Sequence, residues 1–160
     1  LARLAWCTAT AASVVIATDA GRPLWTTAAV GALLATAAFV DITERRLPNS
    51  LSLASGVLAV VEAAVTGHLL ASLAGAAIAG ALLLAVRLAR GLGMGDVKVA
   101  AVIGASVGPH ALAAAPVSIA VAAFAAGGYG LLRNRDRLPL GPALWLGWAC
   151  ALVLLMGWSR

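Results

Sequence analysis

Residues 69–89 read LLASLAGAAIAGALLLAVRLA, an apolar stretch in which Arg87 is the single charged side chain. At about 1.5 Å per residue, a helix over this stretch spans roughly 30 Å, the thickness of the hydrocarbon core of a bilayer. Its alanines and glycines favour close helix packing in lipid, where small residues let backbones approach one another. The stretch therefore predicts a transmembrane helix.

The rest of the chain has the same character. Of its 160 residues, 62% are hydrophobic and 11% are charged, and the mean hydropathy is +1.01. A soluble fold with so few charged residues could not cover its surface with polar groups, whereas a bundle that faces lipid does not need to. We expect an all-α, polytopic membrane helix bundle that forms a single integral-membrane domain over residues 1–160.

Seven apolar runs are predicted to be helices: residues 2–18, 24–40, 50–67, 69–89, 93–107, 111–132 and 142–158. The fifth run is short, so it either begins inside the membrane or joins the sixth run as one bent span. The positive-inside rule favours seven spans with a cytoplasmic N-terminus, because only Arg22 and Arg160 then lie outside. Six spans would move Arg133, Arg135 and Arg137 to the outer face.

The net charge of +5 does not indicate a nucleic-acid partner, because the basic residues lie in short turns and form no continuous basic face. Cys7 and Cys150 sit in apolar runs near opposite ends of the chain, which indicates neither a disulfide framework nor a metal site. We expect no metal and no cofactor. Membrane lipid is the partner that the composition implies.

Two segments carry more polar residues than topology requires: residues 41–49, DITERRLPN, and residues 91–98, GLGMGDVK. The chain crosses the membrane twice between Asp41 and Asp96 and so returns to the face that it left. Both residues therefore lie on the same face, which is predicted to be cytoplasmic. Considered alone, each carboxyl is interpreted as a solvated residue at a helix end that has no catalytic role. Together they are the functional-site hypothesis, because paired carboxylates that share one proton perform aspartic protease chemistry.

Helix polarity predicts different protonation of the two carboxyls. Asp96 opens a helix, where the macrodipole favours negative charge, and Asp41 ends one, so we expect Asp96 to be the carboxylate and Asp41 the acid. Gly93 and Gly95 are expected to allow close approach and unusual dihedrals beside the site. Lys98 either holds Asp96 ionised or extends to the interface.

The residues quoted above resemble the two catalytic signatures of type IV prepilin peptidases: GMGD followed by Val-Lys, downstream of an aspartate followed by Arg-Arg-Leu-Pro-Asn. Residues 138–147, LPLGPALWLG, resemble the segment that opens the final helix of that family. Presenilin-type proteases share a Pro-Ala-Leu signature, found here at 142–144. Their first aspartate follows a tyrosine, however, whereas Val40 precedes Asp41, and this chain is short for that group.

The resemblance implies an aspartic endopeptidase of the inner membrane that removes the leader of type IV prepilin-like precursors, of the Tad/Flp or pseudopilin kind, at the cytoplasmic face. Only residues 19–23 join the first two runs, so the Cys-rich segment of the methylating members is not expected between them. The alternatives are a proton- or cation-coupled transporter using Asp41, Glu62 and Asp96, or a structural subunit of a pilus or secretion complex. Glu62 is interpreted as a protonated packing residue or part of a separate polar site.

Overall fold

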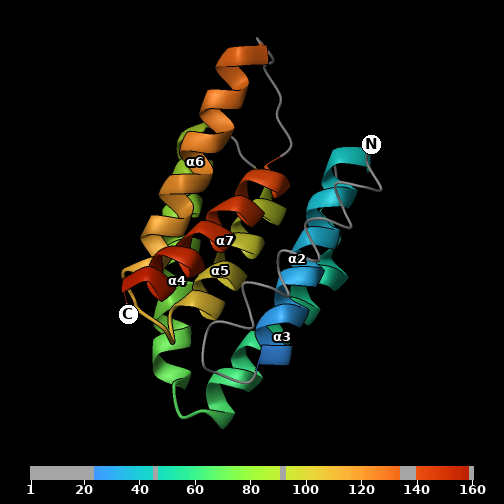
Figure 1. The fold of residues 1–160 in the computed structure, drawn as a ribbon. Coiled ribbons are helices and arrows are strands. Elements are labelled where there is room, and N and C mark those ends of the chain that lie inside the picture. The colour runs from blue at the N-terminus through green and yellow to red at the C-terminus, as the bar shows by residue number, and fades with distance from the viewer. Residues whose placement is uncertain (1–23, 45–46, 91–92, 134–139, 159–160) are drawn as a thin grey trace.

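The computed structural model describes residues 24–44, 47–90, 93–133 and 140–158. This part of the chain forms six α-helices: α2 (Leu24–Glu44), α3 (Asn49–Val65), α4 (Leu69–Arg90), α5 (Met94–Val107), α6 (Ala114–Arg133) and α7 (Gly141–Trp158). The predicted run at 2–18 lies outside the described residues. The helix labels, which begin at α2, are those of Figure 1. For the described part, the all-α prediction is confirmed, with helix ends within a few residues of the predicted runs.

Successive helices run in opposite directions along the bundle (Figure 1). The ends of α2, α4 and α6 therefore gather with the beginnings of α3, α5 and α7 at one end of the molecule. The turn that carries His68 and the turn that carries His110 lie at the opposite end. This alternation places Asp41, at the end of α2, and Asp96, at the beginning of α5, at the same end, as the sequence predicts.

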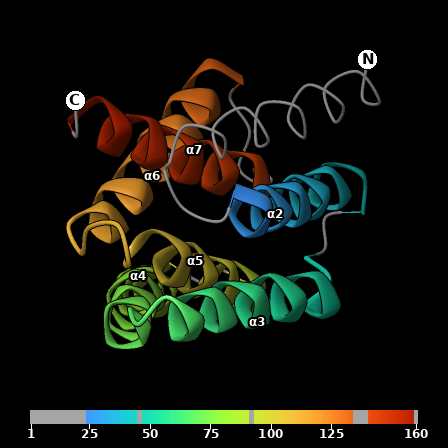
Figure 2. The same ribbon diagram turned by 60° about the horizontal axis from the view of Figure 1, so that its bottom comes forward.

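Helix α5 is the central helix of the bundle. Figure 2 shows α3 and α4 on one side of it and α2 and α7 on the other, and α5 contacts all five other described helices. Eight of its residues are buried: Val97, Val99, Ala100, Val102, Ile103, Gly104, Ala105 and Val107. A helix enclosed in this way needs no long lipid-facing surface, which explains why a run of 14 residues is sufficient.

The fifth and sixth runs are separate helices, because α5 ends at Val107 and α6 begins at Ala114 after a turn. Three described segments are long and apolar enough to cross a membrane: Thr26–Glu44, Leu69–Ala89 and Ala114–Leu131. Helix α5 is not one of them, and Asn49–Val65 and Gly141–Leu155 are shorter apolar helices. The structure thus supports a polytopic membrane protein, while the predicted number of seven spans stays a prediction.

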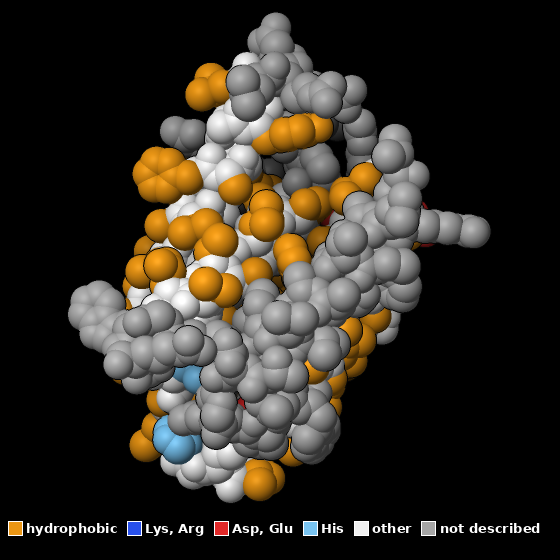
Figure 3. All heavy atoms as spheres, viewed as in Figure 1, with side chains coloured by type: hydrophobic (Ala, Val, Ile, Leu, Met, Phe, Trp, Pro, Cys, Tyr) orange, Lys and Arg blue, Asp and Glu red, His pale blue; other side chains and the backbone are white. Residues whose placement is uncertain are grey.

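Large apolar side chains are exposed on the outside of the bundle. Leu70, Phe124 and Leu131 are each more than four-fifths exposed, at 83%, 83% and 88%. Figure 3 shows hydrophobic side chains spread over much of the described part of the visible face. Such a surface is unfavourable in water and is expected where a helix faces lipid.

Helices α4 and α5 approach each other with almost no side chain between them. A Cβ atom added at Gly104 would overlap the backbone oxygen of Gly75 and lie 2.8 Å from the Cβ of Ala79. The hydroxyl of Ser72 donates a hydrogen bond of 2.9 Å to the carbonyl of Ala105 across the same contact. Small residues and an interhelical hydrogen bond are the usual means of packing helices in lipid.

We predict that Gly104→Ala lowers the free energy of unfolding by about 1–3 kcal/mol, because the added methyl group overpacks this contact. The matched control is Gly127→Ala in α6, where an added Cβ meets nothing within 4 Å. That change is expected to be neutral or to stabilise its helix by up to about 1 kcal/mol. Unfolding by sodium dodecyl sulfate in mixed micelles measures both, and equal stability of the two variants would contradict the prediction.

Candidate active site

Asp41 lies in the last turn of α2 and is buried, with 7% of its surface exposed. Its Oδ2 atom accepts a hydrogen bond of 2.8 Å from the backbone N–H of Gly141, the first residue of α7. The first N–H groups of a helix have no partner within the helix, and the helix dipole makes that end a favourable site for negative charge. The beginning of α7 thus binds the Asp41 carboxyl group.

A side chain at position 141 would disturb this contact. A Cβ atom there would lie 3.0 Å from both the Cβ and the Oδ2 of Asp41, and 3.0 Å from the Cα of Ala38. The next residue, Pro142, suits the first turn of a helix because its missing N–H would have no helical partner there. Sequence reasoning assigned residues 138–147 to the beginning of a helix but did not identify Gly141 as a partner of Asp41.

Asp96 is the third residue of α5, and Gly93 is the N-cap of that helix. The Asp96 carboxyl makes a hydrogen bond with the Gly93 backbone, the arrangement of an acidic N3 residue that reaches back to its N-cap. A Cβ atom at Gly93 would lie 3.1 Å from the Oδ2 of Asp96, so the glycine leaves room for the carboxyl group.

The electrostatics of Asp96 show that the two carboxyls are near each other. Asp96 lies outside the three candidate membrane spans, and its pKa is raised from 3.8 to about 6. Burial is the largest cause, followed by the negative charge of Asp41, while the hydrogen bond with Gly93 acts in the opposite direction. Asp41 and Asp96, which are 55 positions apart in sequence (96 − 41), therefore lie close enough for the charge of Asp41 to act on Asp96.

These observations oppose the protonation predicted from helix polarity. Asp41 does end its own helix, but its carboxyl meets the positive end of α7, a helix that follows about 100 residues later. Asp96 does open α5, but burial and the charge of Asp41 outweigh the favourable dipole. Asp96 therefore keeps its proton to a higher pH than an ordinary aspartate, whereas the Asp41 carboxyl lies at the positive end of α7.

The predicted supporting residues have different surroundings. Close approach is found at Gly95, where a Cβ atom would lie 3.1 Å from the Cβ of Leu47. The expected unusual dihedrals are not found: Gly93 has a φ of −66°, and among the described residues only Gly67 is a glycine with positive φ. The Lys98 ammonium donates a hydrogen bond of 3.0 Å to Oδ1 of Asn49, so its observed partner is at the beginning of α3.

The remaining polar residues considered from sequence lie away from this pair. Glu62 is partly buried in the second half of α3, and Cys150 is exposed on α7. Among the residues that the structure describes, no three His, Cys, Asp or Glu side chains are grouped so that they could hold a metal ion. Cys7 and Arg45 with Arg46 fall outside the described residues.

The model of the type IV leader peptidase family, a family of aspartic prepilin peptidases, matches residues 28–131. The match includes Asp41 and Asp96 but ends before α7. No curated protein and no solved structure matches the chain.

We predict that Asp41→Asn lowers the pH at which Asp96 titrates, because the charge that opposes ionisation of Asp96 is removed. In the unchanged protein Asp96 is protonated below about pH 6 and ionised above it. In the variant the midpoint falls but stays above 3.8, since burial is unchanged. Infrared spectroscopy of protein labelled with ¹³C-carboxyl aspartate follows this titration, and an unshifted midpoint would show that the two carboxyls do not interact.

Proposed function

Because this chain belongs to the type IV leader peptidase family, we propose that it is an intramembrane aspartic endopeptidase that removes the leader peptide from type IV prepilin-like precursors. The observation that carries the proposal is the Asp41–Asp96 pair, in which the charge of one carboxyl raises the pKa of the other. Two carboxyls that share one proton are the reactive unit of an aspartic protease. The proposed substrates are precursors of the Tad/Flp or pseudopilin kind.

In the proposed mechanism Asp41 is the general base and Asp96 is the general acid. Asp41 takes a proton from a water molecule whose oxygen attacks the scissile carbonyl carbon, while Asp96 hydrogen-bonds the carbonyl oxygen. The tetrahedral intermediate collapses as the C–N bond breaks, and the leaving amine takes the proton held by Asp41. The hydrogen bond from Gly141 supports this assignment because it stabilises negative charge on Asp41 before the reaction.

The location of the pair agrees with a substrate held partly in the membrane. Asp41 is in the last turn of a candidate span, and Asp96 opens a helix whose interior is apolar. We propose that the basic leader of the precursor lies on the cytoplasmic side of the inner membrane and that its following apolar helix lies in the bilayer. The cut then falls at the cytoplasmic face, where the positive-inside rule puts both carboxyls.

We predict that Asp41→Asn and Asp96→Asn each lower the rate of leader removal by about 10²–10⁴-fold, because each removes one proton-transferring group. The matched control is Glu44→Gln, which neutralises an exposed acid three positions after Asp41 on the same helix. Cleavage of a co-reconstituted pilin precursor is followed by its mass shift. Normal cleavage by both aspartate variants would disprove the proposed function.

We predict that Gly141→Ala lowers kcat by about 10-fold or more with a smaller change in KM, because the methyl group meets the Asp41 carboxyl and the backbone of Ala38 and displaces the proposed base. Gly128→Ala is the control, since an added Cβ at that position in α6 meets nothing within 4 Å. The same cleavage assay at varied precursor concentration separates the two constants. Equal kcat for both glycine variants would show that α7 does not position Asp41.

A further inference from the structure

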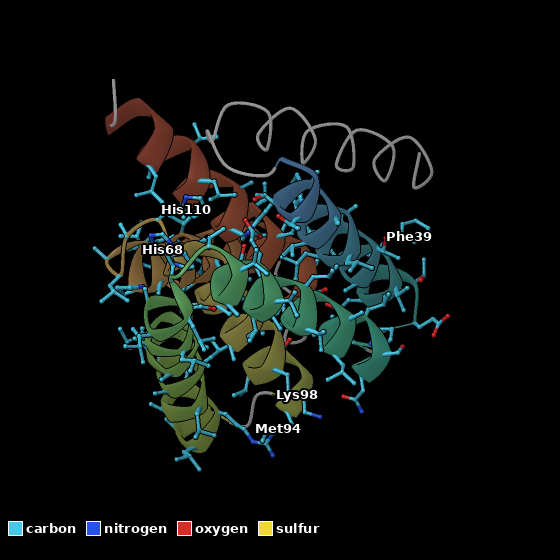
Figure 4. The ribbon with its side chains drawn as sticks, turned by 90° about the horizontal axis from the view of Figure 1, so that it is seen from below. Phe39, His68, Met94, Lys98 and His110 are labelled. Carbon is cyan, nitrogen blue, oxygen red and sulfur yellow. The ribbon has the colours of Figure 1, made fainter. Side chains whose placement is uncertain are left out.

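A second feature of the molecule is a groove lined mainly by α3 and α5, with Ala76 of α4 also in its wall. Its volume is about 690 Å³, which is in the range of small-molecule sites. Its walls include Val57 and Val61 from α3 and Ala101 and Ala105 from α5, and its polar end carries Asn49 and Lys98. Figure 4 shows Lys98 near Met94 at the beginning of α5.

The groove is separate from the candidate active site. Lys98 follows Asp96 by two positions, and successive residues of a helix are about 100° apart, so the two side chains leave α5 in nearly opposite directions. The α5 residues of the groove recur at positions 98, 101, 102 and 105, the spacing of one helix face. The groove therefore lies on the face of α5 opposite to the face that carries Asp96.

We propose that this groove binds one acyl chain of an anionic phospholipid, with the phosphate at Lys98. From Asn49 to Val61 the groove extends about 18 Å, half or more of the hydrocarbon core, along α3. Val57 and Val61 line it and are 52% and 51% exposed, so the groove is open to lipid. An apolar helix with its side chains is about 10–12 Å wide and is much bulkier than this space.

The polar end has the chemistry of a phosphate site. The lysine ammonium carries three N–H donors, and one is donated to Asn49, which holds the side chain at the rim of the groove. Lysine binds phosphate as a compact point charge, and basic pockets between membrane helices bind anionic headgroups. The walls beyond this end are apolar, so the ligand has one charged end and a long apolar tail.

Native mass spectrometry of the purified protein tests this inference. The probes are phosphatidylglycerol and phosphatidylcholine with identical acyl chains. We expect the unchanged protein to bind phosphatidylglycerol about fivefold more tightly than phosphatidylcholine. This difference in affinity is the effect expected of one lysine beside an anionic headgroup. Lys98→Gln is expected to remove this preference and Lys98→Arg to retain it. Equal affinity of the unchanged protein for the two lipids would overturn the proposal.

A second pair of variants tests the apolar part of the groove. Val57→Trp fills it and is expected to weaken binding of both lipids at least threefold, whereas Leu70→Trp changes a side chain on α4 that is 83% exposed and outside the groove. Equal lipid binding by the two tryptophan variants would overturn the proposal. Loss of leader cleavage in Val57→Trp with unchanged lipid binding would also overturn it, because the occupant would then be the apolar helix of the precursor. The inference does not rest on the proposed peptidase function.

Discussion

The direct backbone contact between α4 and α5 is the constraint on which the other features depend. Gly75 and Gly104 leave no room for a side chain between these helices, and Gly108 meets the backbone of Ala71 one turn further along. Because of this contact, a helix of only 14 residues is held in the middle of the bundle. The hydrogen bond from the Trp148 indole of α7 to the Ser106 hydroxyl attaches α5 on another side. The position of Asp96 follows from that of its helix.

The two carboxyls of the candidate site are held by two different helix beginnings. Asp96 interacts with the N-cap of its own helix, and Asp41 accepts a hydrogen bond from the first residue of α7. An N-terminus of a helix is favourable for negative charge in both cases. Burial and the charge of Asp41 raise the pKa of Asp96, because two close carboxylates cannot both ionise easily.

Helix α5 separates two surfaces of different chemistry. One of its faces carries Asp96, and the opposite face carries Lys98 and the apolar wall of the groove. The sequence motif places these residues two positions apart, so a single helical turn supplies the proposed acid and the proposed anion-binding lysine. Asn49 links the groove to the beginning of α3 by its contact with Lys98. Within the GLGMGDVK segment, Asp96 and Lys98 thus have different surroundings.

By itself, the sequence determined the membrane character, the positions of the described helices and the shared end of Asp41 and Asp96, because hydropathy and the number of crossings are properties of the linear chain. The family signatures around both aspartates were also readable in sequence, and the family match confirms the relationship. Only the tertiary structure decided the surroundings of the two carboxyls, which raise the pKa of Asp96. The partner of Asp41 is Gly141, 100 positions later (141 − 41), and helix polarity along the chain contains no information about that contact. The partner of Lys98 was likewise decided by packing, because α3 and α5 meet only after the bundle has formed.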